Sequence, residues 1–168
     1  MRDITSISRL QLLHPAVRDK FKKFIETAED TLNITLRIVQ GLRTFEEQDA
    51  IYQQGRTKPG KIVSNARAGS SYHNYGLAID VAQLVNGQIN WNYDYSHLQQ
   101  IARDFGIIWG ADWDNDGKTK AQGDTDEHLV DMPHFQITFG YQWRTLLIIY
   151  NSKGFIPGTK YLNLPNAA

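Results

Sequence analysis

Residues 70–91 read SSYHNYGLAIDVAQLVNGQINW, and this stretch decides how the rest of the chain is arranged. Its middle alternates apolar and small residues, which predicts a strand over about 76–84. Asn86 and Gly87 then form a strong signal for a tight hairpin turn that leads to a return strand around Ile89. A histidine precedes the strand and an aspartate lies within it. The stretch therefore predicts an antiparallel hairpin beside side chains that can bind a metal.

Helices and strands alternate irregularly along the rest of the chain. Helical spacing and capping signals predict helices at about 15–30, 44–54, 94–105 and 141–152. Alternating or branched apolar residues predict further strands at about 34–39, 107–110 and 132–137. This order predicts a single α+β domain over 1–154, with a central, largely antiparallel sheet flanked by helices. A tail over 155–168 is expected to be loose.

The composition excludes several classes of function. Among 168 residues, 18 basic side chains balance 18 acidic ones, so no nucleic-acid partner is expected. There is no cysteine, which leaves His, Asp and Glu to hold any metal. The N-terminus MRDITSISRLQLLHPAVRDK lacks the apolar core of a signal peptide, and LLIIY at 146–150 is too short to span a bilayer. We expect a protein made in the cytosol without stable membrane insertion.

Three side chains are candidate metal ligands: His73, Asp80 and His134. Asp80 lies among apolar residues, where an ionised carboxylate is costly unless it is paired or bound to a cation. His134 alternates with apolar neighbours and shares its face with Gln136. Two imidazoles and one carboxylate are the protein ligands of a catalytic zinc, and Asp131 lies close enough in sequence to act on water at the open position. On spacing alone, structural roles and an iron oxygenase site remain alternatives, although six residues separate His73 from Asp80.

Several motifs, taken in order, resemble one family of zinc peptidases. Residues 71–80 fit the pattern Ser-x-His-x-x-Gly-x-Ala-x-Asp in full, and DMPHFQ at 131–136 is similar to the second motif of that family. LHPAV, GLRTFEEQDAIYQQGR, VSNARAGSSYHNYGLAIDV and IIWGADW extend the likeness over about 12–140. The chain resembles the zinc D-Ala-D-Ala carboxypeptidase and L-alanyl-D-glutamate peptidase group, within the Hedgehog-type peptidase superfamily. It looks most like phage endolysins of the L-alanyl-D-glutamate type.

The resemblance implies a role for each matching position. It makes three residues the zinc ligands: His73, Asp80 and His134. Asp131 would be the catalytic acid/base, although some relatives have Glu there. Arg43 matches an arginine that faces the substrate carbonyl and stabilises the oxyanion, and its alternative is a surface arginine at a helix entry. Ser71 matches a serine that either contacts the substrate or orders its loop. Gly76 is expected to be a steric requirement beside the metal.

The implied activity is hydrolysis of the L-alanyl-D-glutamate bond in peptidoglycan stem peptides by a monomeric zinc endopeptidase. As a phage endolysin, the protein would wait in the host cytoplasm until released, and then act in the periplasm or cell wall. The same motifs also fit a D-Ala-D-Ala carboxypeptidase or dipeptidase. A non-catalytic, zinc-stabilised wall-binding module is a further alternative, against which the acidic Asp131 argues.

The polar loop DWDNDGKTKAQGDTDE at 112–127 predicts a second site. Three aspartates match the first half of an EF-hand calcium loop: Asp112, Asp114 and Asp116. The twelfth position is Gly123 rather than Glu, so the acidic residues at 124, 126 and 127 would have to complete the site. The alternative is a solvated acidic turn. Because the loop leads into Asp131, bound calcium would order the catalytic segment.

Overall fold

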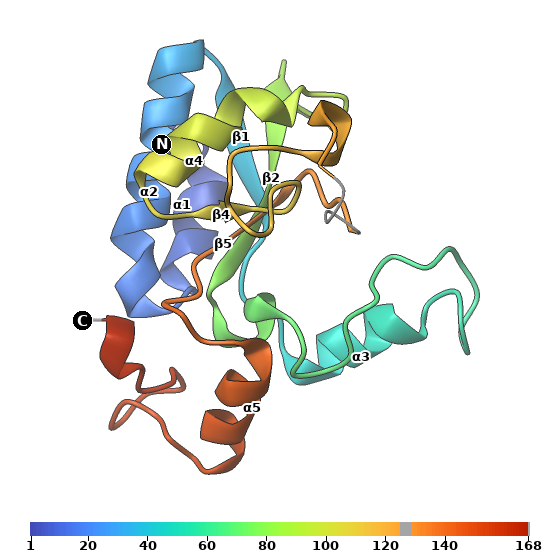
Figure 1. The fold of residues 1–168 in the computed structure, drawn as a ribbon, viewed down its shortest axis with the longest axis vertical. Helices are drawn as coiled ribbons and strands as arrows, with labels where there is room; N and C mark the ends of the chain where they lie inside the picture. The colour runs from blue at the N-terminus through green and yellow to red at the C-terminus, as the bar shows by residue number, and fades with distance from the viewer. Residues whose placement is uncertain (125–128, 168) are drawn as a thin grey trace.

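Strand β2 (Ala78–Val85) lies inside a five-stranded sheet in the computed structural model, which describes residues 1–124 and 129–167 (Figure 1). The sheet order is β1-β2-β5-β4, and β3 also pairs with β2. These strands are β1 (Thr35–Gln40), β3 (Gln88–Asn90), β4 (Ile108–Trp109) and β5 (His134–Gln136). Every strand pair in this sheet is antiparallel, which confirms the predicted α+β class and the hairpin between β2 and β3.

The described part of the chain contains five α-helices: α1 (Ile4–Gln11), α2 (Pro15–Leu32), α3 (Phe45–Gln53), α4 (Gln99–Asp104) and α5 (Trp143–Asn151). Short 3-10 turns complete the fold: η1 (Tyr72–Tyr75), η2 (Tyr95–Leu98), η3 (Lys120–Gln122) and η4 (Pro165–Ala167). Helices α1, α2 and α4 lie along one side of the sheet, whereas α3 and the long loop after it project from the body (Figure 1). Within the described residues, no helix is both long enough and apolar enough to cross a membrane.

The sequence did not predict helix α1. Ile4 and Ile7 remain 81% and 45% exposed, and Ser6 and Leu10 are the buried residues of the helix. The helix begins with a capping interaction, because Asp3 accepts the Ser6 backbone N–H at 2.8 Å. Arg37 of β1 also contacts Asp3, at 2.8 Å. Polar contacts with its neighbours therefore hold α1 in place.

The main core fills the space between α2 and the sheet. Phe24 of α2 packs on Phe135 of β5 with ring centroids 5.0 Å apart, and both side chains are fully buried. Burying a side chain of this size contributes roughly 1.5–3 kcal/mol. Ile79 and Val81 belong to the same core. Because neighbouring side chains on a strand point to opposite faces, Asp80 between them faces away from α2.

Side chains of α1 and α2 cover the outer edge of β1. The backbone N–H of Leu36 donates to the Glu29 carboxylate at 3.1 Å, and that of Ile38 donates to the Ser6 hydroxyl at 2.8 Å. Arg9 donates to the Ile38 carbonyl at 2.6 Å. Glu29 and Ser6 are themselves buried. Backbone groups that an edge strand normally leaves unpaired are therefore bonded within the chain.

The expectation of a loose C-terminal tail is wrong. Leu162 and Leu164 are only 2% and 5% exposed and join the hydrophobic core. The Nε2 of His14 lies 2.8 Å from the Leu162 carbonyl oxygen, and Arg18 donates to the Tyr161 hydroxyl at 3.0 Å. Two buried leucines and these polar contacts hold the segment against the start of α2, which no local pattern in the tail could indicate.

Candidate metal centre

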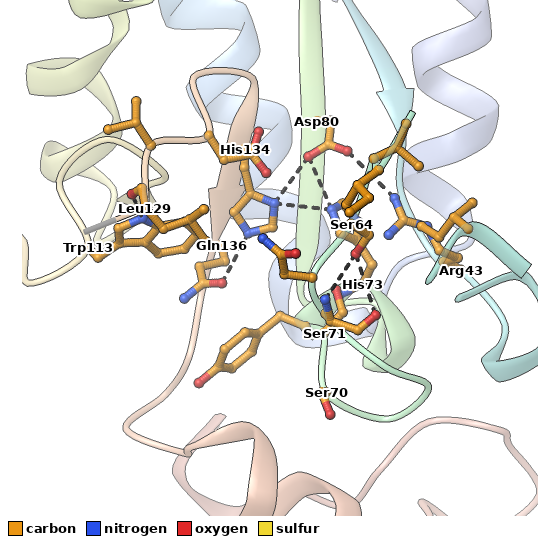
Figure 2. A pocket seen from close by; sticks show the side chains of 18 residues that line it. Arg43, Ser64, Ser70, Ser71, His73, Asp80, Trp113, Leu129, His134 and Gln136 are labelled. Carbon is orange, nitrogen blue, oxygen red and sulfur yellow. Dashed lines mark hydrogen bonds and ion pairs between the residues drawn. The ribbon is translucent and has the colours of Figure 1, made fainter. Parts of the chain in front are cut away.

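Three ligand atoms converge on the face of the sheet that Asp80 occupies (Figure 2). Asp80 on β2 and His134 on β5 lie directly opposite each other in the antiparallel register. His73 comes from η1, just before β2. The Nε2 of His73, the Oδ1 of Asp80 and the Nδ1 of His134 lie 3.1 Å from one another. The structure thus brings together the three residues that the sequence predicts as ligands.

The donor set of these three residues fits a cation. The Nδ1 of His73 lies 2.8 Å from the Gly41 carbonyl oxygen, so it carries the proton and leaves Nε2 with a lone pair. The Nε2 of His134 lies 3.1 Å from the Gln136 side-chain oxygen, which likewise leaves Nδ1 with a lone pair. Two lone pairs and a carboxylate oxygen then face one another, an arrangement that a cation between them stabilises. Tetrahedral zinc requires ligand atoms about 3.3 Å apart, close to the observed 3.1 Å.

The same side chains also compete for protons. Burial disfavours the ionised Asp80, but the charges and hydrogen bonds of His73 and His134 hold the pKa of Asp80 well below its usual range. Burial also disfavours a charged imidazole, yet the hydrogen bond and charge of Asp80 raise the pKa of His134. Protons and metal ions therefore compete for the same lone pairs, as expected of a site that releases protons when it binds a metal.

The turn before β2 sets the position of His73. The Ser71 hydroxyl accepts the His73 backbone N–H at 3.3 Å, and Gly76 ends η1 in the left-handed region with φ +68°. A Cβ at Gly76 would lie 2.7 Å from the His14 backbone nitrogen. Gly76 is thus a steric requirement, but against the α1–α2 connection rather than beside the metal as expected. Ser71 orders the loop and also lines the groove described below.

A tight turn against the end of β4 carries both Asp131 and His134. Asp131 donates its backbone N–H to the Gly110 carbonyl at 2.7 Å, and Gly110 donates to the His134 carbonyl at 2.8 Å. The Asp131 residue remains exposed, yet desolvation of its carboxyl by the surrounding protein raises its pKa, and the charge of Asp80 adds to this. A Cβ at Gly110 would collide with the Asp131 carbonyl oxygen. The absence of a side chain at Gly110 therefore lets the turn lie close enough to present Asp131 and His134 together.

Replacing Gly110 by alanine is expected to lower kcat/KM by at least about 10-fold, or about 1.4 kcal/mol. Overpacking at this contact is also expected to lower the free energy of unfolding by about 1–3 kcal/mol. Gly106→Ala is the control, because Gly106 has φ +67° but nothing within 4 Å of the position that a Cβ would take, so it adds backbone strain without a collision. Urea unfolding and peptidase assays of both variants test this. Equal losses of activity in the two variants would contradict the role of Gly110.

Arg43 lies on the side of Asp80 away from His134 (Figure 2). Its Nη2 is 3.8 Å from the Asp80 Oδ2, and its Nη1 donates to the Gln48 side-chain oxygen at 2.9 Å. Its side chain is only 13% exposed, so it is not the surface arginine of the alternative interpretation. Gln48 is fully buried and also donates to the Ala66 carbonyl at 2.8 Å. The guanidinium of Arg43 is therefore fixed in position by Gln48 and faces the candidate metal centre.

A cavity of about 560 Å³ opens in front of the three ligands. Arg43, Ser71 and Asp131 line it together with the ligands. Apolar side chains form part of its two sides: Ile62 and Val63 from the loop after α3, and Leu129 and Val130 from the segment before β5. This volume lies within the usual range for ligand sites. The sequence-predicted zinc, acid/base and substrate residues therefore share one groove.

The aspartates of the acidic loop lie close to one another, but the carboxylate of one of them already accepts hydrogen bonds from other groups of the protein. The oxygens of Asp112, Asp114 and Asp116 lie within 4.8 Å of one another. Asp112 is fully buried and accepts the Gly117 N–H at 3.2 Å and the Gln99 amide at 3.0 Å, with Arg103 Nη1 3.5 Å away. The acidic residues at 126 and 127 lie outside the described residues. Proximity of the three aspartates alone does not support calcium binding.

Asp114→Ala is therefore expected to leave activity within about 2-fold of the parent, with or without added calcium, as for most exposed substitutions. Asp112→Ala is the contrasting variant, because it leaves the charge of Arg103 without its carboxylate partner. It is expected to lower the unfolding temperature independently of calcium. Peptidase assays and thermal unfolding in calcium and in a calcium chelator test both. A calcium-dependent loss of activity in Asp114→Ala would restore the calcium prediction.

Three residues at the site have no role assigned from the sequence: Gln48, Gly110 and Gln136. A signal for Gln136 was present, because it follows His134 by two positions on a strand and so shares its face. Gln48 bonds both Arg43 and the Ala66 carbonyl, and Gly110 matters through the close approach of Asp131, contacts that spacing does not reveal.

Comparison with known proteins finds similarity to peptidoglycan peptidases. Residues 10–127 match the VanY family, described as D-alanyl-D-alanine carboxypeptidase. The match ends before Asp131 and His134, whose place at the site comes from the geometry. The chain is 44% identical over 112 residues to the peptidoglycan L-alanyl-D-glutamate endopeptidase CwlK of Bacillus subtilis (strain 168). That alignment covers 60% of this chain and 66% of CwlK, just under two thirds of the relative.

Solved structures share the fold. The L-Ala D-Glu endopeptidase ChiX of Serratia marcescens superposes with a TM-score of 0.53 and 26% identity, covering 81% of this chain and 88% of ChiX. A vancomycin-resistance D,D-pentapeptidase VanY, solved in complex with Zn(II), gives a TM-score of 0.51 and 19% identity over 74% of this chain and 72% of that chain. At that identity, the second comparison supports the fold alone.

Proposed function

Because the chain belongs to the VanY D-alanyl-D-alanine carboxypeptidase family, we propose that it is a zinc endopeptidase that hydrolyses the L-alanyl-D-glutamate bond of peptidoglycan stem peptides. One observation carries this proposal. His73, Asp80 and His134 converge at 3.1 Å in a chain that is 44% identical, over 112 residues, to an enzyme named for that bond. Zinc is the metal proposed, since two imidazoles and one carboxylate are a common catalytic zinc set.

When bound, zinc would supply Lewis-acid chemistry that polarises a carbonyl oxygen and activates water. Three residues would hold it: His73, Asp80 and His134. Asp131, in the wall of the groove, would take the proton from the attacking water and give it to the leaving amine. Arg43 would stabilise the oxyanion, a contribution typically worth about 10²–10³ in kcat for one donor. Substrate contact is also proposed for Ser71, which lines the same groove.

A second candidate activity is removal of a terminal D-Ala by a D-Ala-D-Ala carboxypeptidase or dipeptidase. The description of the matched family favours it, and it would use the same residues in the same roles. The likeness to CwlK and ChiX favours the L-alanyl-D-glutamate bond instead, because both of those proteins are named for it.

Digestion of purified peptidoglycan, with and without a metal chelator, tests these alternatives. New peptide ends are identified by mass spectrometry. Chelator-sensitive cleavage between L-Ala and D-Glu is the expected result. Release of a terminal D-Ala would assign the chain to the carboxypeptidase alternative. Zinc binding without cleavage of either bond would favour a zinc-stabilised wall-binding module.

We also propose, from the resemblance to phage endolysins, that the enzyme acts as a monomer during lysis of a bacterial host. It would remain in the host cytoplasm until released, and then reach peptidoglycan in the periplasm or cell wall. Cells that express the protein are expected to lyse only after the inner membrane is permeabilised. Turbidity measurements with and without a pore-forming agent test this, and lysis without permeabilisation would contradict it.

A further inference from the structure

Gln136 joins the candidate metal centre to the groove. It lies on β5, where its backbone pairs with Ala78 of β2, and its side chain is part of the groove lining although the residue is only 6% exposed. Its amide oxygen lies 3.1 Å from the Nε2 of His134 (Figure 2). It is therefore in contact with a proposed zinc ligand and with the space where a substrate would lie.

The hydrogen bonding of His134 determines how the Gln136 amide is oriented. Coordination through Nδ1 requires the imidazole proton to be on Nε2, and that N–H needs an acceptor. The side-chain amide of Gln136 can accept only through its oxygen. Turning the amide over would place its NH₂ group against the imidazole N–H, donor against donor. Metal coordination at one end of the imidazole thus dictates the amide orientation at the other.

With its oxygen committed to His134, Gln136 directs its amide nitrogen away from the imidazole (Figure 2). No residue in the described ranges, 1–124 and 129–167, accepts a hydrogen bond from that nitrogen in the structure. Arg43 lies on the opposite side of the ligand cluster, beyond Asp80. The groove would therefore offer a neutral donor on the His134 side and a cationic donor on the Asp80 side, both suited to oxygens of a peptide.

We propose that Gln136 is a positioning residue that holds His134 in the Nε2–H tautomer and presents its amide N–H to an oxygen of the bound stem peptide. This inference rests on the proposed peptidase function for the substrate contact. The role of Gln136 in orienting His134 does not depend on the peptidase function, because it concerns metal binding. Two different substitutions of Gln136 test its role toward His134 and its contact with the substrate separately.

Gln136→Met keeps the length of the side chain but removes both the acceptor and the donor. Loss of the acceptor behind a ligating imidazole typically weakens metal binding about 10–100-fold, so we expect a weakening in this range when zinc affinity is measured by competition with a chromophoric chelator. Nitrogen-15 NMR of the His134 imidazole in the zinc-free variant is expected to show loss of the pure Nε2–H tautomer, because no metal on Nδ1 then fixes the proton on Nε2. Gln83→Met is the matched control, since the Gln83 side chain bonds Asn90 in the β2–β3 hairpin. Zinc affinity of Gln136→Met equal to that of the parent would overturn the positioning role.

Gln136→Glu retains an acceptor for His134 but replaces the donor in the groove by a carboxylate oxygen. We expect zinc affinity at or above that of the parent, and a KM for a soluble stem peptide raised at least about 10-fold, because acceptor then faces acceptor. An unchanged KM would overturn the substrate contact. If the zinc-loaded parent cleaves no stem peptide, the proposed function fails, and the zinc affinities and NMR spectra still decide the role toward His134.

Discussion

Asp131→Asn is expected to lower kcat by about 10²–10⁴-fold, the usual contribution of a general acid/base. The amide has nearly the shape of the carboxylate but cannot take a proton from water. Because Asp131 is not among the three converging ligand atoms, zinc affinity should change little. The expected result is therefore a zinc-loaded, folded and almost inactive protein, observed by measuring metal content and peptide cleavage on the same sample.

Asp104→Asn provides the matched control for Asp131→Asn. Asp104 is an exposed carboxylate at the end of α4 that accepts a hydrogen bond from Gln100 at 2.8 Å, and it does not line the groove. The same chemical change at Asp104 should leave kcat unaltered. Full activity of Asp131→Asn would remove Asp131 from the catalytic machinery and mean that another group takes the proton from water.

His73→Ala is expected to abolish measurable activity by removing one of the three ligands. Removing a group that only supports a ligand typically weakens metal binding about 10–100-fold, so the loss of a direct ligand should exceed about 100-fold. Asp80 and His134 would remain paired at 3.1 Å but would form an incomplete site. Zinc content after dialysis, measured by atomic emission, and the dissociation constant from chelator competition report this directly.

His97→Ala is the control for His73→Ala, because it removes a histidine that does not belong to the metal centre. His97 lies on η2 and is 58% exposed at its side chain, with Asp94 3.8 Å away as an ion-pair partner when it is protonated. That variant should retain one zinc per chain and the parent activity. If His73→Ala also retained stoichiometric zinc and activity, the metal would have to lie elsewhere, and the three-residue centre would be wrong.

Local patterns predicted the elements that local forces determine. The alternation before Asn86 and the Asn-Gly turn specify β2 and its hairpin with β3, because turn geometry and strand pairing act over a few residues. Thr44 and Glu47 form a capping box at the start of α3, and this local signal lies behind the helix predicted at about 44–54. The unpredicted α1 and the docked tail depend on contacts with distant parts of the chain, which periodicity cannot detect.

At the candidate site, too, some features could be predicted from the sequence and others depend on contacts between distant residues. The resemblance identified His73, Asp80 and His134 as ligands, yet only the pairing of β2 with β5 explains how Asp80 meets a residue 54 positions away. Spacing in the sequence carries no information on that register. The need for glycine at position 110 likewise follows from the approach of a turn more than twenty residues later. The resemblance thus predicted which residues bind the metal, whereas their arrangement in space could be known only from the fold.

The covered edge of β1 has a consequence for how the protein behaves at high concentration. An uncovered edge strand is a template on which a second copy can add its own strand, and repeated addition leads to aggregation. Here the side chains of Glu29, Ser6 and Arg9 already form hydrogen bonds with backbone groups of that edge. All of these partners lie within the first 38 residues, so a nascent chain can shield this edge before β2 has been synthesised. The protein should therefore accumulate during expression without fibrils growing from this strand.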